Sequence, residues 1–150
     1  MWSNEKVSSL LFSIRIGRAS EALFDWDNAV AMFNKALADN PSYEPARWAV
    51  ANLHLLRGNY NEVLRLVGPD SALHKRAVQM QQQDAQCQAG NANACARIGI
   101  SLFYSDGAAE GENAAEKYLR LSCPKDRQGC HYVKELAKMR SEMNRVTRNP

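Results

Sequence analysis

The chain of 150 residues is 45% hydrophobic and 23% charged, and it carries a net charge of +3. This composition is typical of a globular domain rather than of a disordered or collagen-like chain. The charge is too small to indicate a nucleic-acid-binding protein, which needs a concentrated basic face. No apolar run approaches the roughly 18 residues that a membrane-spanning helix requires. We therefore expect one folded domain, residues 1–150, that binds no nucleic acid and does not insert into a membrane.

Two amphipathic helices are predicted at the start of the chain. Residues 7–23 place apolar side chains on one stripe that includes Gly17, where a neighbouring helix can approach closely. Asp25 is expected to cap a second helix, and the Asn40-Pro41 step to end it. The second helix carries small and aromatic side chains at helical spacing: Ala29, Phe33 and Ala36.

A second pair of helices is predicted before residue 70. Ser42 is a suitable cap for the third helix, which Gly58 ends. Asn59, with Glu62 three residues further on, resembles a capping pair for a short fourth helix that Gly68-Pro69 ends. The first part of the chain is thus expected to form two helical hairpins, residues 7–43 and 44–69.

A shift of 34 residues aligns these two hairpins with each other, and that is the period of tetratricopeptide repeats. The first hairpin resembles this family because its signature positions are occupied by Gly17, Ala29, Phe33, Ala36 and Pro41. The second hairpin departs from the pattern at Ala51, Val63 and Asp70, so we describe it as degenerate. The resemblance implies stacked hairpins whose first helices line a concave, protein-binding surface.

Further helices are predicted in the second half of the chain. A linking helix, residues 70–90, is expected to end at Gly90, and Asn91 to cap the next helix. A third hairpin, residues 91–124, and a final capping helix, residues 128–146, follow. The sequence therefore predicts an all-α fold of about eight helices.

The third hairpin resembles a Sel-one-like repeat, a close cousin of the tetratricopeptide repeat with a longer loop between its helices. The resemblance rests on Ala94, Cys95, Ile98, Gly99, Leu102, Phe103, Tyr104, Gly107, Ala114, Ala115, Tyr118 and Cys123. It departs from the pattern in residues 124–129, where the link between repeats is one residue short. Together, the two resemblances imply an α-α superhelix, a tetratricopeptide and Sel-one-like solenoid.

The four cysteines form two local pairs, Cys87 with Cys95 and Cys123 with Cys130. The likeness is to the cysteine-rich bacterial branch of the Sel-one-like family, which implies a disulfide across the helix–helix corner at each pair. Free buried thiols are an alternative, and so is a zinc site that includes His131, although zinc ligands are usually more closely spaced.

Disulfides indicate an oxidising compartment, so we expect a periplasmic or secreted protein whose export signal is absent from this sequence. A cytoplasmic protein with reduced thiols is the alternative.

The search for catalytic residues, metal ligands and cofactor motifs finds none that the sequence supports. Ser3-x-x-Lys6 matches the serine-lysine motif of β-lactamases, an activity discussed for the cysteine-rich Sel-one-like proteins, but its partner motifs are missing. His54, His74 and His131 lie on three different predicted helices with no obvious Ser or Cys partner. We therefore expect that the protein is not an enzyme and needs no cofactor, with an envelope hydrolase or β-lactamase as the alternative.

Protein binding is the function that the resemblance favours. The family pattern predicts a concave surface that includes Arg18, Trp48, Asn52, Leu55, Phe103 and Tyr104. Core packing is the alternative for Trp48 and Phe103, and the basic final helix is a second candidate surface for an acidic protein. We expect a non-catalytic adaptor for a protein or peptide partner, acting in secretion, pilus or envelope assembly. A cytoplasmic chaperone or regulatory subunit is the rival interpretation, and no oligomeric state is predicted.

Overall fold

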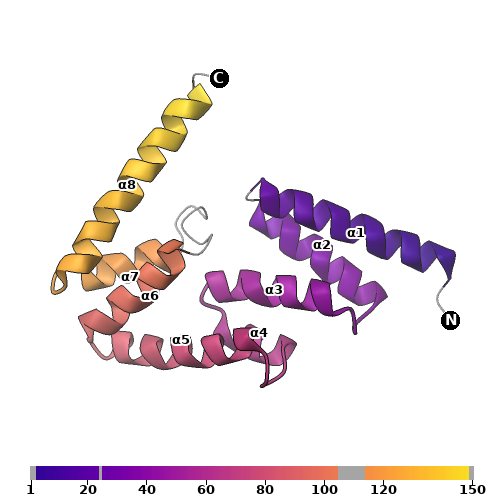
Figure 1. The fold of residues 1–150 in the computed structure, drawn as a ribbon, viewed down its shortest axis with the longest axis horizontal. Coiled ribbons are helices and arrows are strands. Elements are labelled where there is room, and N and C mark those ends of the chain that lie inside the picture. Colours follow the sequence, from indigo (N-terminus) through magenta and orange to yellow (C-terminus); the bar gives the residue numbers. More distant parts are fainter. Residues whose placement is uncertain (1–2, 24, 105–113, 149–150) are drawn as a thin grey trace. The chain divides into compact units, whose positions relative to one another are not determined.

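Figure 1 shows the computed structural model, which describes residues 3–23, 25–104 and 114–148. These residues form eight α-helices and no β-strand, so the predicted all-α fold is confirmed. The helices are α1 (Asn4–Ala22), α2 (Trp26–Asp39), α3 (Glu44–Leu56), α4 (Tyr60–Leu66), α5 (Ala72–Gln88), α6 (Ala92–Tyr104), α7 (Ala114–Ser122) and α8 (Arg127–Arg148). The loop predicted around Gly107 lies outside the described residues, and the superhelical arrangement stays a prediction.

The chain divides into two compact units, Met1–Val78 and Gln79–Pro150. The division falls inside α5, which therefore contributes residues to both units. Both hairpins predicted before residue 70 belong to the first unit, and the third belongs to the second unit. Within the described residues, no helix combines the length and the apolar content that crossing a membrane would require.

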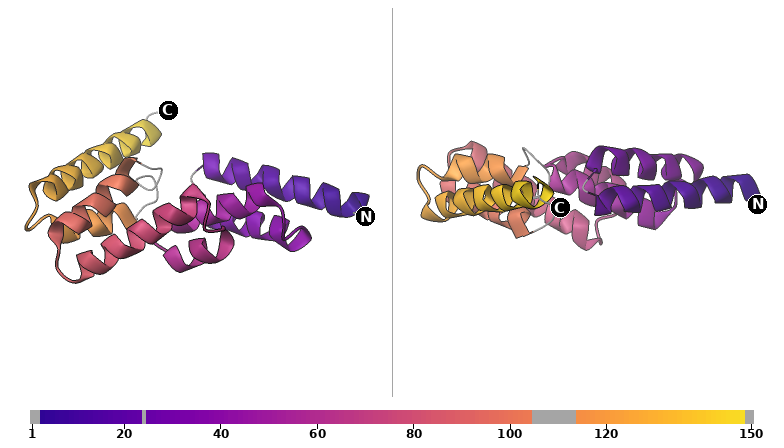
Figure 2. Two further views of the ribbon diagram at one scale, coloured as in Figure 1. Left: turned by 60° about the horizontal axis from the view of Figure 1, so that its bottom comes forward. Right: turned by 90° about the horizontal axis from the view of Figure 1, so that it is seen from above.

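The core of the first unit is built around Phe33 on α2. Its side chain is 1% exposed, and Ala29 and Ala36 on the same helix are fully buried. A Cβ atom added at Gly17 on α1 would lie 2.9 Å from Phe33 Cε1, so the close approach of α1 to α2 depends on glycine at this position. The role predicted for Gly17 is confirmed. Figures 1 and 2 show α1 and α3 each lying beside α2.

Several predicted helix ends are confirmed by the structure. Asp25 Oδ1 accepts a hydrogen bond of 3.3 Å from the backbone N–H of Asn28, and Asn91 Oδ1 accepts one of 3.1 Å from Ala94. Gly58 follows α3 with a φ of 76°, a left-handed conformation that favours glycine. Each of these signals acts within a few residues of the chain, which is why the sequence alone revealed them.

Two predicted caps are absent from the described structure. Ser42 lies before α3 without capping it, and its backbone N–H donates a 3.1 Å hydrogen bond to Asn40 Oδ1 instead. Asn59 precedes α4 but forms no side-chain cap; its amide nitrogen lies 3.4 Å from His54 Nδ1, and Glu62, its predicted partner, pairs with Arg65 at 2.7 Å. For α3 the N-cap residue is Tyr43, so Ser42 lies one residue before the capping position.

The core of the second unit is formed by α6, α7 and α8. Ile98, Leu102 and Leu136 are at most 2% exposed. A Cβ atom added at Gly99 would lie 2.7 Å from Leu119 Cδ2, so α6 and α7 are also packed across a glycine. Each unit therefore has a glycine that permits close contact between two helices.

Replacement of Gly129 by alanine is expected to destabilise the second unit by about 1–3 kcal/mol, because overpacking forces side chains and backbone to move. An added Cβ atom would overlap Ser122 Oγ and lie 3.1 Å from the backbone nitrogen of Cys123. Urea unfolding followed by circular dichroism measures the effect. Gly68→Ala is the matched control, since nothing lies within 4 Å of its added Cβ atom. Equal stability of the two variants would contradict the packing described for α7 and α8.

Two disulfides close the predicted corners between helices. Cys87 and Cys95 join the end of α5 to the start of α6 with a Cα–Cα distance of 4.8 Å. Cys123 and Cys130 join α7 to α8 with a Cα–Cα distance of 4.3 Å. The predicted pairing is confirmed, and because all four sulfur atoms are used in it, the free-thiol and zinc alternatives do not describe this structure.

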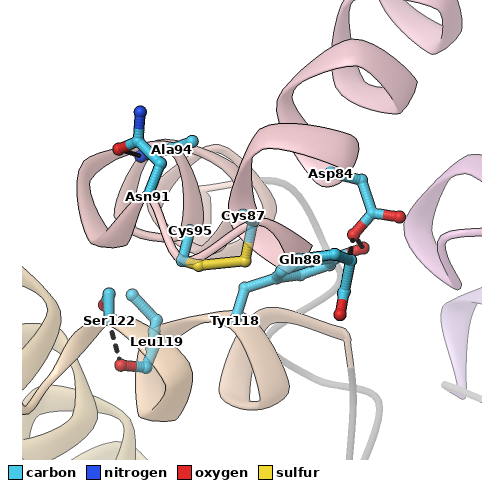
Figure 3. Close-up of a disulfide and its surroundings, with 9 residues drawn as sticks. All are labelled: Asp84, Cys87, Gln88, Asn91, Ala94, Cys95, Tyr118, Leu119 and Ser122. Carbon is cyan, nitrogen blue, oxygen red and sulfur yellow. Dashed lines mark hydrogen bonds between the residues drawn. A yellow bond between two sulfur atoms is a disulfide. The ribbon is translucent and has the colours of Figure 1, made fainter.

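A polar contact lies beside the first disulfide (Figure 3). The Tyr118 hydroxyl on α7 donates a hydrogen bond of 2.7 Å to Asp84 Oδ1 on α5. The side-chain amide of Gln88 donates to the same carboxylate oxygen at 3.2 Å. Together with the Cys87–Cys95 bond, these contacts fix the last turns of α5 against α6 and α7.

Candidate functional site

A pocket of about 400 Å³ lies in the first unit, at the start of α3. This size falls within the range of pockets that bind small ligands or single peptide side chains. The residues that line it come from α3 and from the turn between α4 and α5: Glu44, Pro45, Arg47, Trp48, Val67, Gly68 and Ser71. Trp48 is 54% exposed, so its indole is available to a ligand.

The turn between α4 and α5 forms one wall of the pocket and is held by its own hydrogen bonds. The backbone N–H of Ser71 donates to the Gly68 carbonyl at 3.0 Å, and Ser71 Oγ accepts from the Leu73 N–H at 3.2 Å. His74 Nδ1 lies 3.0 Å from the Val67 carbonyl oxygen. A wall fixed in this way offers a ligand a preformed surface.

The pocket combines an aromatic surface, an apolar wall and one weakly held cation. Pro45 and Val67 supply the apolar wall next to Trp48. Arg47 lies 3.5 Å from the carboxylate of Glu44, which is 84% exposed, and such exposed ion pairs contribute little to stability. Arg47 can therefore exchange this partner for a carboxylate of a ligand at small cost.

Of the residues predicted to form a concave surface, only Trp48 lines this pocket. Trp48 lines it, and Asn52 lies one turn further along α3 and is half-buried. Arg18 is exposed on α1 and does not line the pocket. Leu55 is 0% exposed, so its side chain cannot contact a partner from the surface, and we correct its assignment to core packing.

Phe103 and Tyr104 belong to the second unit, where they form an aromatic cluster with Tyr132 of α8. The Phe103 ring centroid lies 5.4 Å from that of Tyr104 and 5.1 Å from that of Tyr132, with edge-to-face geometry. The two tyrosine hydroxyls are 2.8 Å apart, and this hydrogen bond raises the pKa of Tyr132. Tyr104 is 73% exposed, whereas Phe103 is half-buried.

Of the residues that line the pocket, sequence reasoning predicted only Trp48, and it also missed one member of the aromatic cluster. Arg47 and Val67 line the pocket, and Tyr132 completes the aromatic cluster. The Gly68-Pro69 break did signal a turn after α4, but it did not indicate that this turn would lie against α3. Tyr132 lies 28 residues from Tyr104, and no local pattern connects the two.

The residues considered for catalysis have structural partners. Ser3 Oγ accepts a 3.4 Å hydrogen bond from the backbone N–H of Lys6, the geometry of a helix cap. His54 is partly buried, which lowers its pKa, and its Nδ1 atom lies 3.4 Å from the side-chain amide of Asn59. Among the described residues, no group of three or more His, Cys, Asp or Glu side chains is arranged to hold a metal ion.

Glu116 on α7 links that helix to α8 through Arg140, and it also pairs with Arg120 on its own helix. The hydrogen bond from Arg140 is the main cause that lowers the pKa of Glu116 below its ordinary value of 4.5. The ionised Glu116 carboxylate therefore stabilises the folded state fully above pH 4.5, and this stabilisation is lost as the pH falls through the lowered pKa of the folded state.

Replacement of Glu116 by glutamine is expected to lower the free energy of unfolding of the second unit by about 1 kcal/mol at pH 7. The difference from the unmodified protein should shrink once the pH falls below 4.5, because this carboxylate is then protonated in the unfolded chain while it is still ionised in the folded one, and the remaining difference is lost as the pH falls through the lowered pKa of the folded state. Urea unfolding at pH 7 and pH 3 measures both values. Glu135→Gln, which removes an exposed pair with Lys138 on the same helix, is the control. A Glu116→Gln effect that is undiminished at pH 3 would contradict this assignment.

A scan against protein-family models and a search of curated proteins found no match to this chain.

Proposed function

We propose that this protein is a non-catalytic, peptide-binding adaptor built from tetratricopeptide-type and Sel-one-like helical hairpins. The observation that carries the proposal is the exposed indole of Trp48 beside a pocket of about 400 Å³. Tryptophan and arginine are the residues that most often dominate binding energy at protein interfaces. Trp48 and Arg47 are neighbours at the edge of one pocket, which supports a binding role.

The ligand that fits this chemistry is a short peptide segment with one apolar side chain followed or preceded by a carboxylate. The apolar side chain would enter the pocket between Trp48 and the apolar wall formed by Pro45 and Val67. The carboxylate would replace Glu44 as the partner of Arg47, in a hydrogen bond between charged groups. Asn52 lies one helical turn beyond Trp48 on α3, where its side chain would contact the backbone of a longer peptide.

The two disulfides support a site of action in an oxidising compartment, since the cytosol keeps most thiols reduced. We propose that this compartment is the bacterial periplasm or the exterior of the cell, and that the adaptor acts in secretion, pilus or envelope assembly. The biological setting follows from the family resemblance rather than from the pocket itself.

Replacement of Trp48 by alanine is expected to weaken peptide binding at least tenfold, because truncating the exposed aromatic residue that lines the pocket removes most of the apolar contact area offered to a peptide. The ligands are peptides selected from a random displayed library against the complete chain, and their dissociation constants are measured by fluorescence anisotropy. Phe12→Ala is the matched control, since Phe12 is an aromatic residue of the same unit, 61% exposed, that does not line the pocket.

Two results are expected from this experiment. The selected peptides must lose affinity for the Trp48→Ala variant and keep it for Phe12→Ala, while both variants retain the helical circular dichroism of the unmodified protein. Equal affinity for the two variants would place the binding surface elsewhere on the chain.

A further inference from the structure

The disulfide between Cys123 and Cys130 borders a pocket of about 440 Å³ at the corner between α7 and α8, which we call the corner pocket. Both cysteines line this pocket and are half-buried, so part of each is open to solvent. Cys87 and Cys95 border a smaller pocket of about 280 Å³, but they are only 5% and 3% exposed. The two disulfides therefore differ in how easily a small molecule can reach their sulfur atoms.

The corner pocket carries an excess of positive charge. Its lining includes one carboxylate, Asp126, and three exposed cations, Lys125, Arg127 and Lys134. With His131 neutral, these residues give the lining a net charge of +2. Among the described residues, none of the three cations has an ion-pair partner. The smaller pocket beside the other disulfide has Lys125 as its single charged lining residue within the described part of the chain.

The carboxylates near the corner pocket are engaged by other groups. Asp126 Oδ1 accepts hydrogen bonds of 2.8 Å and 3.4 Å from the backbone N–H groups of Gln128 and Gly129 at the start of α8. Glu135, further along α8, pairs with Lys138 at 2.9 Å. An anion that enters the pocket therefore meets more positive than negative charge, and the three cations are available to it.

The two sulfur atoms of the Cys123–Cys130 bond lie at opposite helix ends. Cys130 is in the first turn of α8, where the positive end of the helix dipole and the nearby cations stabilise a thiolate. Cys123 directly follows the last residue of α7, where the dipole is negative. Cys130 is therefore the better leaving group of the two when a thiol attacks the bond.

We propose that Cys123–Cys130 is a site of thiol–disulfide exchange with small anionic thiols, which carry carboxylate or sulfonate groups. The incoming thiolate forms a bond to Cys123 Sγ, and the Cys123–Cys130 bond breaks with its electron pair on Cys130 Sγ. A second thiolate then bonds to the sulfur of the first, and Cys123 Sγ leaves as a thiolate. Two thiols are thus oxidised to one disulfide while the protein bond is reduced, and the reverse reaction restores it.

In this reaction, Lys125, Arg127 and Lys134 hold the acidic groups of the incoming thiol next to the exposed bond. Such charges raise the local concentration of an anionic reactant and thereby its rate of attack. Cys87–Cys95 lacks both the exposure and the cluster of cations, so it serves as an internal reference in the same molecule. The exchange site is independent of the Trp48 pocket.

The test uses the complete oxidised chain and three thiols of the form HS–CH₂–CH₂–X. The group X is anionic in 2-mercaptoethanesulfonate, neutral in 2-mercaptoethanol and cationic in 2-aminoethanethiol. Samples are trapped at intervals with excess N-ethylmaleimide, and mass spectrometry of their proteolytic fragments gives the initial rate at which each disulfide opens. We compare the ratio of the two rates, Cys123–Cys130 over Cys87–Cys95, because the intrinsic reactivity of each thiol cancels in this ratio.

The expected ratio is at least tenfold with the sulfonate and at least threefold lower with the cationic thiol. At about 500 mM salt, the dependence on the charge of the thiol should largely disappear. Arg127→Gln with Lys134→Gln should lower the ratio for the sulfonate at least threefold. Arg145→Gln with Arg148→Gln is the matched control, since it removes the same charge from exposed positions at the far end of α8 and should leave the ratio within twofold.

Three outcomes would overturn the proposal. Equal initial rates for the two disulfides, or faster opening of Cys87–Cys95, would show that the corner pocket does not expose a reactive bond. A ratio that is the same for all three thiols would mean that exposure alone governs the reaction, without selection of anionic thiols. Equal losses in the two double variants would assign the effect to the net charge of the chain rather than to the corner pocket.

Discussion

Replacement of Phe33 by alanine is expected to lower the free energy of unfolding of the Met1–Val78 unit by about 3–5 kcal/mol. Phe33 is 1% exposed. Its ring packs against Gly17, where an added Cβ atom would lie only 2.9 Å from Phe33 Cε1. Its removal would leave a cavity between α1 and α2, and the neighbouring Ala29 and Ala36 are too small to fill it. This is a large fraction of the stability of a small unit, so many copies of the variant would be partly unfolded at 37 °C.

Phe12→Ala provides the matched control for Phe33→Ala. Both variants lose the same group of atoms, but Phe12 is 61% exposed, so its loss should change stability by less than about 0.5 kcal/mol. Urea unfolding, combined with amide hydrogen exchange in α1, α2 and α3, measures the difference. Similar stability of the two variants would mean that Phe33 does not form the centre of this core.

Reduction of both disulfides is expected to lower the stability of the Gln79–Pro150 unit by about 4–6 kcal/mol, with each bond contributing about 2–3 kcal/mol. The bonded cysteines are separated by eight and seven residues, so each bond closes a short loop and restricts the unfolded chain only moderately. The bonds also fix the corners at which α6 and α8 begin. The loss is therefore expected in α6, α7 and α8.

The Met1–Val78 unit contains no cysteine and serves as the internal control. Hydrogen exchange should accelerate in α6, α7 and α8 after reduction and remain unchanged in α1, α2 and α3. The double variants Cys87→Ser with Cys95→Ser and Cys123→Ser with Cys130→Ser separate the two bonds. Stability that is unaffected by reduction would contradict a structural role for the disulfides.

Much of the fold was predictable because its signals are local. The cap at Asp25, the close approach at Gly17 and the stop at Gly58 each depend on a few neighbouring residues. The caps predicted at Ser42 and Asn59 are wrong. The third helix has Tyr43, not Ser42, at its N-cap, and Glu62 pairs with Arg65 rather than with the start of α4, details that the sequence does not fix.

The candidate site was only partly predictable from the sequence. Trp48 was identified because the resemblance to tetratricopeptide repeats implies a surface position there, with core packing as the alternative, and the structure leaves it 54% exposed. Leu55 was assigned to the same surface, but it is fully buried, because burial depends on every neighbour in the tertiary structure rather than on one helix face. Arg47 and Val67 were missed because the wall of the pocket comes from a turn whose position against α3 is set by packing.

The central claim is that a peptide binds at Trp48, and it can be tested by fluorine NMR on protein labelled with 5-fluorotryptophan. The chain has three tryptophans, and the resonance of Trp48 is assigned by its loss in the Trp48→Phe variant. Titration with a selected peptide is expected to shift the Trp48 resonance in a saturable manner while that of Trp26, which is 7% exposed, stays in place. Saturable peptide binding that leaves the Trp48 resonance unmoved would contradict the account.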